Sequence, residues 1–160
     1  MSLSIVPAYD HLADIRQLFS EYTQMLVEGD PSFQKYLKIQ HYEDELNNPI
    51  EKYGSPDGRL YIALMDGAPA GCIALRRIDA QSCEMKRLFV RPAHRDKGIG
   101  SQLVHTIIND ARTIGYRRML LDTLPFLERA IQMYQKLGFR EIPMYNDSPM
   151  SSSIYMQLDL

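Results

Sequence analysis

The segment from Arg91 to Gly100 brings together residue types that bind phosphate groups. Gly98 and Gly100 flank Ile99 at the expected start of a helix, where the first backbone N–H groups have no partner within the helix. The aligned peptide dipoles add partial positive charge at the same place. Three cationic side chains stand in this segment, those of Arg91, Arg95 and Lys97. A turn of uncovered amides with cations beside it suits a phosphate or pyrophosphate.

A Gly-x-Gly pair is weak evidence by itself, and other interpretations compete with a pyrophosphate site. The glycines also fit a tight turn that needs positive φ, with the basic residues simply solvated. A Walker A loop does not fit, because the Gly-Lys-[Ser/Thr] ending is missing. A dinucleotide-binding fold usually carries its glycine turn in the first βαβ unit, whereas here the turn follows an expected antiparallel hairpin. An ATP site needs an acidic or hydroxyl partner for magnesium, and Asp96 alone is poor support for one.

Hydrophobic periodicity predicts a mixed α/β chain in which strands and helices alternate. Strands are expected at 3–6, 59–65, 69–77, 83–90, 118–122, 139–142 and 154–160. Helices are expected from a cap at Asp10 to a stop at 29–31, at 32–46 as one helix or two, at 98–113 and at 128–137. Gly138 is expected to end the last helix in a left-handed conformation. Asp66-Gly67 indicates a hairpin, although Ala68 and Pro69 suggest a loop longer than two residues.

Length and composition place bounds on the class of protein. A chain of 160 residues suits one domain spanning 1–160, and a net charge of -2 makes no electrostatic case for nucleic acid or an anionic membrane. No apolar run approaches the roughly 20 residues that cross a bilayer, and no segment resembles a signal peptide, so we expect a cytoplasmic location. Cys72 and Cys83 lack the spacing of metal ligands. We expect free thiols and no metal site, although the sequence does not exclude a disulfide between the two cysteines.

Two signatures in the second half of the chain match one known family. The run Arg95-Asp96-Lys97-Gly98-Ile99-Gly100, preceded by Leu88-x-Val90-x-Pro92, resembles the acetyl-CoA loop Gln/Arg-x-x-Gly-x-Gly/Ala of the GNAT superfamily of N-acetyltransferases. Downstream, Ala130-x-x-x-Tyr134-x-x-x-Gly138-Phe139 resembles the family's Ala-x-x-x-Tyr-x-x-x-Gly-Phe signature, in the expected order and separation. The resemblance implies an α/β (α+β) fold with a mixed, mostly antiparallel central sheet of about six to seven strands. Helices would flank this sheet, and its two central strands would splay apart.

The resemblance also implies how acetyl-CoA, as co-substrate, is held. Backbone groups around Leu88, Phe89 and Val90 are expected to pair with the pantetheine arm, which lies like an added strand. The loop is expected to hold the pyrophosphate, with contributions from Arg95, Asp96, Lys97, Gly98, Ile99, Gly100 and Ser101. One position departs from the pattern, because many relatives carry an asparagine where this chain has Leu127. Asp122 and Thr123 are the candidates to supply polar contacts instead.

Tyr134 and Glu84 are the catalytic residues that the resemblance implies. Tyr134 matches the position of a general acid for the departing thiolate, and Glu84 matches a position where some relatives carry a base. A base is useful because a lysine-like amine is neutral at pH 7 in only roughly one molecule of a few thousand, a cost of about 4 to 5 kcal/mol. A core tyrosine and a carboxylate paired with Lys86 or Arg87 are the alternatives. No cysteine demands a covalent intermediate, although Cys83 lies beside Glu84.

The acceptor is expected, as in the family, at the first helices and the last hairpin. Candidate substrate-binding residues are Gln34, Tyr36, Tyr42, Lys86, Arg87 and Tyr145, with His41 and the run Tyr145-Asn146-Asp147-Ser148-Pro149 beside them. Exposed polar residues and core aromatics are the alternative for each. Lys86 and Arg87 suit an acceptor carboxylate, as in an amino acid or similar metabolite.

Direct acetyl transfer in a ternary complex to the primary amine of a small molecule is the leading hypothesis for the function. A protein lysine or N-terminus is the alternative acceptor. A non-catalytic acyl-CoA sensor or interaction module is the alternative from another class. The sequence leaves open whether the chain forms a homodimer.

Overall fold

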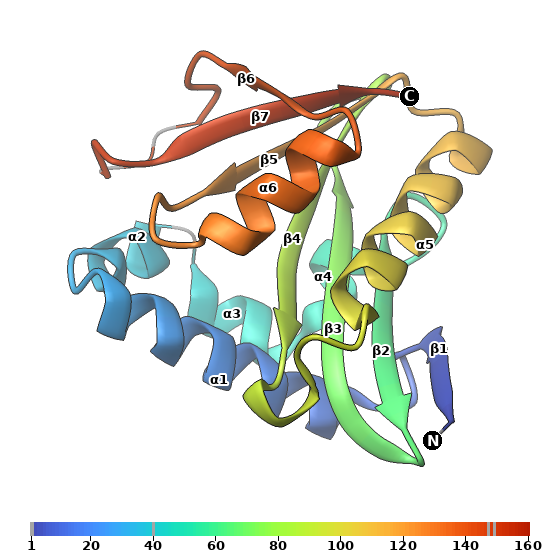
Figure 1. The fold of residues 1–160 in the computed structure, drawn as a ribbon. Coiled ribbons are helices and arrows are strands. Elements are labelled where there is room, and N and C mark those ends of the chain that lie inside the picture. The colour runs from blue at the N-terminus through green and yellow to red at the C-terminus, as the bar shows by residue number, and fades with distance from the viewer. Residues whose placement is uncertain (1, 40, 147, 149) are drawn as a thin grey trace.

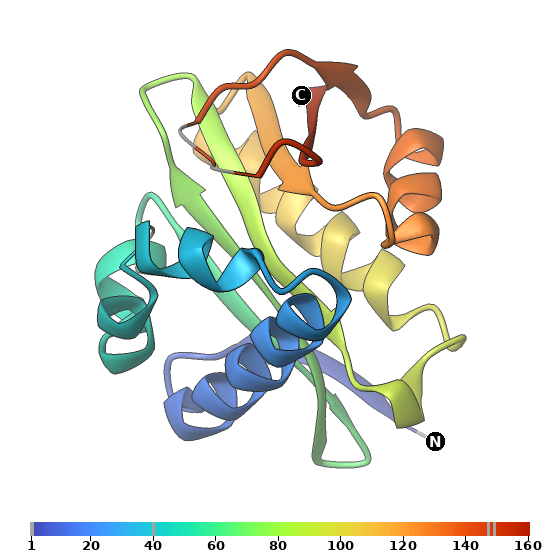
Figure 2. The same ribbon diagram turned by 90° about the vertical axis from the view of Figure 1, so that its left-hand side faces the viewer.

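Seven strands form one mixed sheet in the order β1-β2-β3-β4-β5-β7-β6, with helices on both faces (Figure 1 and Figure 2). The structure, a computed structural model, describes residues 2–39, 41–146, 148 and 150–160. The strands are β1 (Leu3–Pro7), β2 (Arg59–Met65), β3 (Ala68–Arg77), β4 (Ser82–Val90), β5 (Arg118–Thr123), β6 (Arg140–Ile142) and β7 (Ile154–Asp159). The helices are α1 (Leu12–Gly29), α2 (Phe33–Ile39), α3 (Tyr42–Asn47), α4 (Pro49–Tyr53), α5 (Ile99–Ile114) and α6 (Glu128–Lys136), and a short 3-10 helix spans Pro92–His94. Of the strand pairs in the described residues, only β4 with β5 is parallel, which confirms the expected mostly antiparallel sheet.

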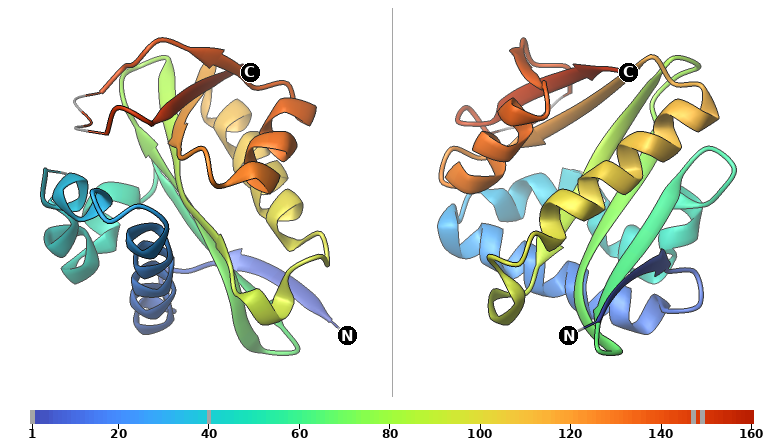
Figure 3. Two further views of the ribbon diagram at one scale, coloured as in Figure 1. Left: turned by 60° about the vertical axis from the view of Figure 1, so that its left-hand side comes forward. Right: turned by 45° about the vertical axis from the view of Figure 1, so that its right-hand side comes forward.

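The two faces of the sheet bury separate hydrophobic cores, because side chains alternate along each strand. On β2, Leu60 and Ile62 belong to the core beneath the N-terminal helices, whereas Ala63 belongs to the core beneath α5. The buried side chains of α5 recur at helical spacing and are those of Ile99, Leu103, Val104, Ile107, Ile108 and Ala111. Figure 3 shows α1 and α5 on opposite faces of the sheet.

The centre of the sheet opens between β4 and β5, as expected. β4 pairs with β5 only over the three residues Ser82 to Glu84, and the strands then separate (Figure 1). β4 also bulges against β3, since Arg87 and Leu88 stand opposite the single residue Ile73. Arg87 has φ 59, a left-handed conformation that is uncommon for a residue with a side chain. A bulge interrupts strand pairing and redirects side chains, here beside the opening.

Two local predictions were wrong. The β2–β3 hairpin has a two-residue loop, Asp66-Gly67, because Met65 pairs directly with Ala68. Both loop residues have positive φ, 52 and 84, as a two-residue turn of this type requires. Pro69 is accommodated at an irregularity in the strand register and does not lengthen the loop. Asp10 makes no cap, since α1 begins at Leu12 without a side-chain cap.

Other local predictions are confirmed. The segment after α1 forms two short helices, α2 and α3, which is one of the two expected forms. Gly138 follows α6 with φ 104, in the left-handed conformation expected of it. Cys72 and Cys83 are free and buried. Among the described residues, the structure contains no helix with the length and apolar character that a membrane span requires.

Candidate active site

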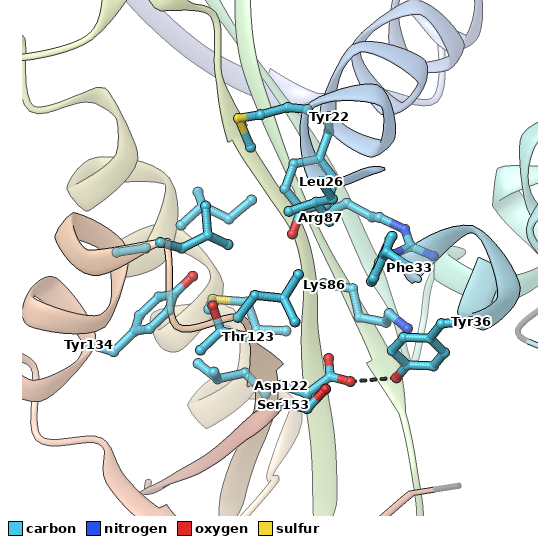
Figure 4. A pocket seen from close by; sticks show the side chains of 17 residues that line it. Tyr22, Leu26, Phe33, Tyr36, Lys86, Arg87, Asp122, Thr123, Tyr134 and Ser153 are labelled. Atoms are coloured by element: carbon cyan, nitrogen blue, oxygen red, sulfur yellow. Dashed lines mark hydrogen bonds between the residues drawn. The ribbon is translucent and has the colours of Figure 1, made fainter. Parts of the chain in front are cut away.

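Two pockets meet where β4 separates from β5. The loop pocket is lined by 88–90, 94–96, 98–101, 126–130, Met25 and Met133. The splay pocket is lined by 85–88, 121–124, Tyr22, Met25, Leu26, Phe33, Tyr36, Leu127, Ala130, Tyr134 and Ser153 (Figure 4). Met25, Leu88, Leu127 and Ala130 line both, so the two pockets adjoin. A ligand in the loop pocket can therefore reach a second ligand in the splay pocket.

The start of α5 forms the floor of the loop pocket. Gly98 precedes the helix with φ 76, and an added Cβ there would meet nothing within 4 Å, so the backbone conformation and not lack of space favours glycine. An added Cβ at Gly100 would meet only the Val90 side chain, at 3.8 Å. The first turn of α5 thus presents its amides to the pocket with little side-chain cover, an arrangement suited to a phosphate group.

Only one of the three cations predicted around this loop lines the loop pocket. That residue is Arg95, whose Nε donates a hydrogen bond to the Val90 carbonyl at 3.1 Å. Arg91 instead forms an ion pair with Glu21 at 2.8 Å. Lys97 is not among the lining residues. Asp96 does line the pocket and pairs with Arg129, so a cation not predicted from the sequence is also present.

The edge of β4 forms one wall of the loop pocket. Leu88, Phe89 and Val90 all line it, as the sequence predicts for the pantetheine site. On the side facing β5, β4 has no registered strand partner beyond Glu84 in the part of the chain that the structure describes. An extended ligand with amide groups can therefore lie along this edge in the manner of an added strand.

Leu127, where many relatives carry an asparagine, stands at the junction of the pockets. Asp122 and Thr123, the predicted substitutes for that polar contact, line the splay pocket and not the loop pocket. Leu127 therefore supplies an apolar surface at the junction, and Asp122 and Thr123 face the splay pocket.

Tyr134 lies on α6 and lines the splay pocket (Figure 4). Its ring packs against Phe139, with centroids 5.6 Å apart. Burial, followed by the nearby Tyr22 and Asp122, raises the pKa of Tyr134 well above its usual range. The hydroxyl has no hydrogen-bond partner among the described residues, so a protonated donor faces the pocket.

Glu84 lies behind the splay pocket and is not among its lining residues. One carboxylate oxygen accepts a hydrogen bond from Arg76 Nε at 2.6 Å, and the other accepts one from the Tyr145 hydroxyl at 2.5 Å. Burial acts to raise the pKa of Glu84, but Lys86, Arg76 and Tyr145 outweigh it and lower the pKa. Glu84 is thus a buried, charged group behind the pocket. It forms an ion pair with the lining residue Lys86, whose Nζ lies 3.9 Å from Glu84 Oε1.

The polar wall of the splay pocket includes three of the six predicted substrate-binding residues, Tyr36, Lys86 and Arg87. Tyr36 donates a hydrogen bond to Asp122 Oδ2, which also accepts one from Asn146 at 3.1 Å (Figure 4). Arg87 is held by two hydrogen bonds to Glu45, of 2.7 and 3.0 Å.

The remaining predicted substrate residues lie elsewhere. Gln34, His41 and Tyr42 line a separate groove on the N-terminal helices. Tyr145 contacts Glu84 behind the splay pocket. Asp147 and Pro149, within the predicted run, lie outside the described residues.

Two residues of the site, Glu45 and Tyr22, were missed by sequence reasoning. Glu45 is buried against Arg87, although it stands in an acidic run, 43–45, that resembles a solvated helix face. Tyr22 lines the splay pocket, although its spacing indicates only a core position. Cys83, beside Glu84, is buried, and burial raises the pKa of its thiol to about 12, which disfavours the nucleophilic thiolate.

Comparisons with known proteins agree with the fold. The profile of the Acetyltransferase (GNAT) family matches residues 12–139. An uncharacterized N-acetyltransferase of Schizosaccharomyces pombe is 36% identical over 100% of this chain and 95% of its own length. The PaiA N-acetyltransferase of Thermoplasma acidophilum, solved in complex with coenzyme A, has a TM-score of 0.79 at 21% identity and covers 100% of both chains. A GNAT family acetyltransferase of Elizabethkingia anophelis with acetyl-CoA bound has a TM-score of 0.62 at 22% identity and covers 99% of this chain and 98% of its own. At these identities the two structures show a shared fold.

Proposed function

The chain belongs to the acetyltransferase (GNAT) family, and from this premise we propose that it moves the acetyl group of acetyl-CoA to the primary amine of a small molecule. The observation that supports the proposal most is the junction of the two pockets at Leu88, with Tyr134 facing the splay pocket. A two-substrate transfer needs two adjoining sites and a proton donor beside the leaving group. The buried lining of the splay pocket favours a small acceptor over a protein segment.

The loop pocket would hold acetyl-CoA. Amides at the start of α5, between Gly98 and Ser101, face the pyrophosphate, and Arg95 adds a cation at the rim. The pantetheine arm would lie along the open edge of β4 at Leu88–Val90. This direction brings the thioester to the junction, beside Leu127 and Ala130.

The transfer can then be written with its atoms balanced. The bound ammonium first releases one proton, and the nitrogen lone pair attacks the thioester carbonyl. The C–N bond forms, the C–S bond breaks, and the nitrogen loses a second proton while the sulfur gains one. Each turnover therefore releases one proton overall. Tyr134, kept protonated by its raised pKa, donates a hydrogen bond to the sulfur as negative charge develops there.

We assign the acceptor ammonium to Asp122, which lines the splay pocket. One of its oxygens is held by Tyr36 and Asn146, which leaves Oδ1 to face the acceptor. The role of Glu84 as base stays a prediction. Its two oxygens are occupied by Arg76 and Tyr145, so an amine would reach it only through an intervening group.

Calorimetric titration with acetyl-CoA, alongside ATP as a control ligand, tests the donor site first. We expect micromolar binding of acetyl-CoA and none of ATP. A thiol-release assay over a panel of amines then tests the transfer. Binding of acetyl-CoA without thiol release from any amine would favour an acyl-CoA sensor, and absence of binding would contradict the proposed donor site.

A further inference from the structure

A cluster of buried and partly buried charges surrounds the inner end of the splay pocket, and its signs do not balance. The carboxylates are those of Glu45, Glu84 and Asp122, and the cations are those of Lys52, Arg76, Lys86 and Arg87. Four cations against three carboxylates leave one positive charge in excess. A buried charge without a partner is costly, so the location of the excess charge identifies where an anion is stabilised.

Three of the cations have a carboxylate oxygen within 3.0 Å, although Arg87 and Lys52 share the single carboxylate of Glu45. Arg87 forms two hydrogen bonds with Glu45 and stacks its guanidinium on the Tyr42 ring, 5.4 Å from the ring centroid. Lys52 lies 3.0 Å from the same carboxylate. Arg76 lies 2.6 Å from Glu84. The side chains of Lys52 and Arg76 are also 26% and 33% exposed, so water contributes to stabilising their charges.

Lys86 is the exception. Its side chain is 6% exposed and lines the splay pocket, yet its closest carboxylate is Glu84 at 3.9 Å, through the same oxygen that Arg76 already holds. No other carboxylate of the described residues lies within 4.0 Å of its ammonium, and no described group accepts a hydrogen bond from it. The ammonium points toward Tyr36, at the end of the pocket away from Tyr134 (Figure 4).

We propose that Lys86 binds the carboxylate of the acceptor, so that the small molecule acetylated by this protein is an α-amino acid or a close analogue. The inference rests on the proposed function and names its substrate class. Lys86 supplies a charge-assisted hydrogen bond to the carboxylate, and Asp122 attracts the ammonium of the same molecule. The apolar walls formed by Leu26, Phe33 and Leu124 suit an apolar side chain. A simple amine would leave the excess charge of Lys86 unmatched.

The electrostatics of the pocket agree with this assignment. Burial, followed by the like charge of Arg87, lowers the pKa of Lys86 to about 8, while Glu84 and Asp122 act to raise it and Lys52 to lower it further. A bound carboxylate would stabilise the charged form and raise this pKa. Acceptor affinity should therefore fall as the pH rises above about 8, because the neutral amine cannot attract a carboxylate.

The test compares each of several apolar α-amino acids with its α-amide, which keeps the amine but loses the negative charge. A charge-assisted hydrogen bond between buried groups predicts a preference of roughly 10- to 100-fold in kcat/KM for the acid. Lys86→Met is expected to bring this ratio close to one, mainly by raising KM for the acid, and Lys86→Arg to retain part of it. Lys52→Met is the matched control, because Lys52 lies in the same cluster but does not line the pocket.

The outcomes separate the assignment from the function on which it rests. Equal use of acids and amides by the wild type, or an unchanged ratio in Lys86→Met, would overturn the assignment while leaving acetyl transfer intact. Failure of every amine despite acetyl-CoA binding would overturn both. If Lys86→Met does not fold, Lys86→Gln takes its place: this uncharged polar variant should also bring the ratio close to one, and an unchanged ratio would overturn the assignment.

Discussion

The loop pocket and the splay pocket meet at Leu88, but they are built in opposite ways. The loop pocket is made largely from short consecutive runs, and backbone amides at 98–101 form its floor. Its pair of Arg129 with Asp96 is 81% and 73% exposed. The splay pocket draws side chains from α1, α2, β4, β5, α6 and the segment before β7, and most of its charged groups are buried.

This difference predicts where mutations act strongly. Water screens the exposed charges of the loop pocket, so each contributes little alone. The buried charges of the splay pocket interact strongly and are costly to separate. Changes near the splay pocket should therefore affect stability and turnover, whereas changes at the loop should affect mainly donor binding.

The largest effect is expected from the buried pair beside the splay pocket. Glu45→Gln leaves the guanidinium of Arg87 without its anion, and breaking such a pair lowers the free energy of unfolding by about 3 to 5 kcal/mol. Urea unfolding measures the change. Glu43→Gln, on the exposed face of the same helix, is the control and should change stability by less than about 0.5 kcal/mol. Similar losses in both variants would remove burial as the explanation.

The Glu45 effect should also depend on pH. Burial acts to raise the pKa of Glu45, but Arg87 and Lys52 outweigh it and lower the pKa to about 2. Because the unfolded value is about 4.3, the stabilisation is fully present above about pH 5 and is lost as the pH falls toward 2. The stability gap between wild type and Glu45→Gln should accordingly narrow in acid.

The next largest effect is expected at the junction. Tyr134→Phe removes the hydroxyl that faces the departing sulfur but keeps the ring that packs on Phe139. We expect kcat to fall by roughly 100-fold or more, while acetyl-CoA affinity by calorimetry stays nearly unchanged. Unchanged kcat would exclude Tyr134 as the proton donor.

A pair of amide variants can distinguish the role of Asp122 from the role of Glu84. Asp122→Asn should raise KM for the acceptor by about 10-fold, because the ammonium loses a charged partner in the pocket. Glu84→Gln should chiefly lower the melting temperature, since it weakens the contact with Arg76. A folded Glu84→Gln enzyme with strongly reduced kcat and an altered pH profile would instead support the predicted base.

The smallest effect of the series is expected at the loop. Gly100→Asp adds a negative charge in the first turn of α5, where it suits the helix dipole but opposes a pyrophosphate. Stability should be unchanged or slightly higher, while acetyl-CoA affinity falls by about 10-fold. Gln102→Asp, exposed and outside the lining of the pocket, is the control. Equal affinities in the two variants would contradict a pyrophosphate site at this turn.

Prediction from the sequence succeeded best where one segment sets the local backbone shape. Gly98, Gly100 and the strand before them specify a local backbone shape, and a local shape is set by φ preferences and helix geometry that neighbouring residues determine. The wrong local predictions, the hairpin loop and the Asp10 cap, depended on contacts that compete with propensity. Pro69 lies at an irregularity in the pairing of β2 with β3. The residue that precedes α1 is His11, one position after the predicted cap Asp10.

The splay pocket shows the limit of such reasoning. Lys86 and Arg87 are adjacent in the sequence and were predicted together for the same acceptor carboxylate, yet Arg87 is matched by Glu45 and Lys86 is not. The positive φ of Arg87 at the bulge and the fold of α3 against β4 decide this, and neither has a signal in the local sequence.

By itself the sequence determined the family resemblance, the α/β architecture and the backbone-lined loop, because each depends on residues close together in the chain. Only the tertiary structure decided which buried charges are matched, which aromatic residues face the acceptor, and how far Glu84 lies from the pocket wall. Those properties depend on distances between side chains from separate elements, and electrostatic interactions in a buried site vary steeply with such distances.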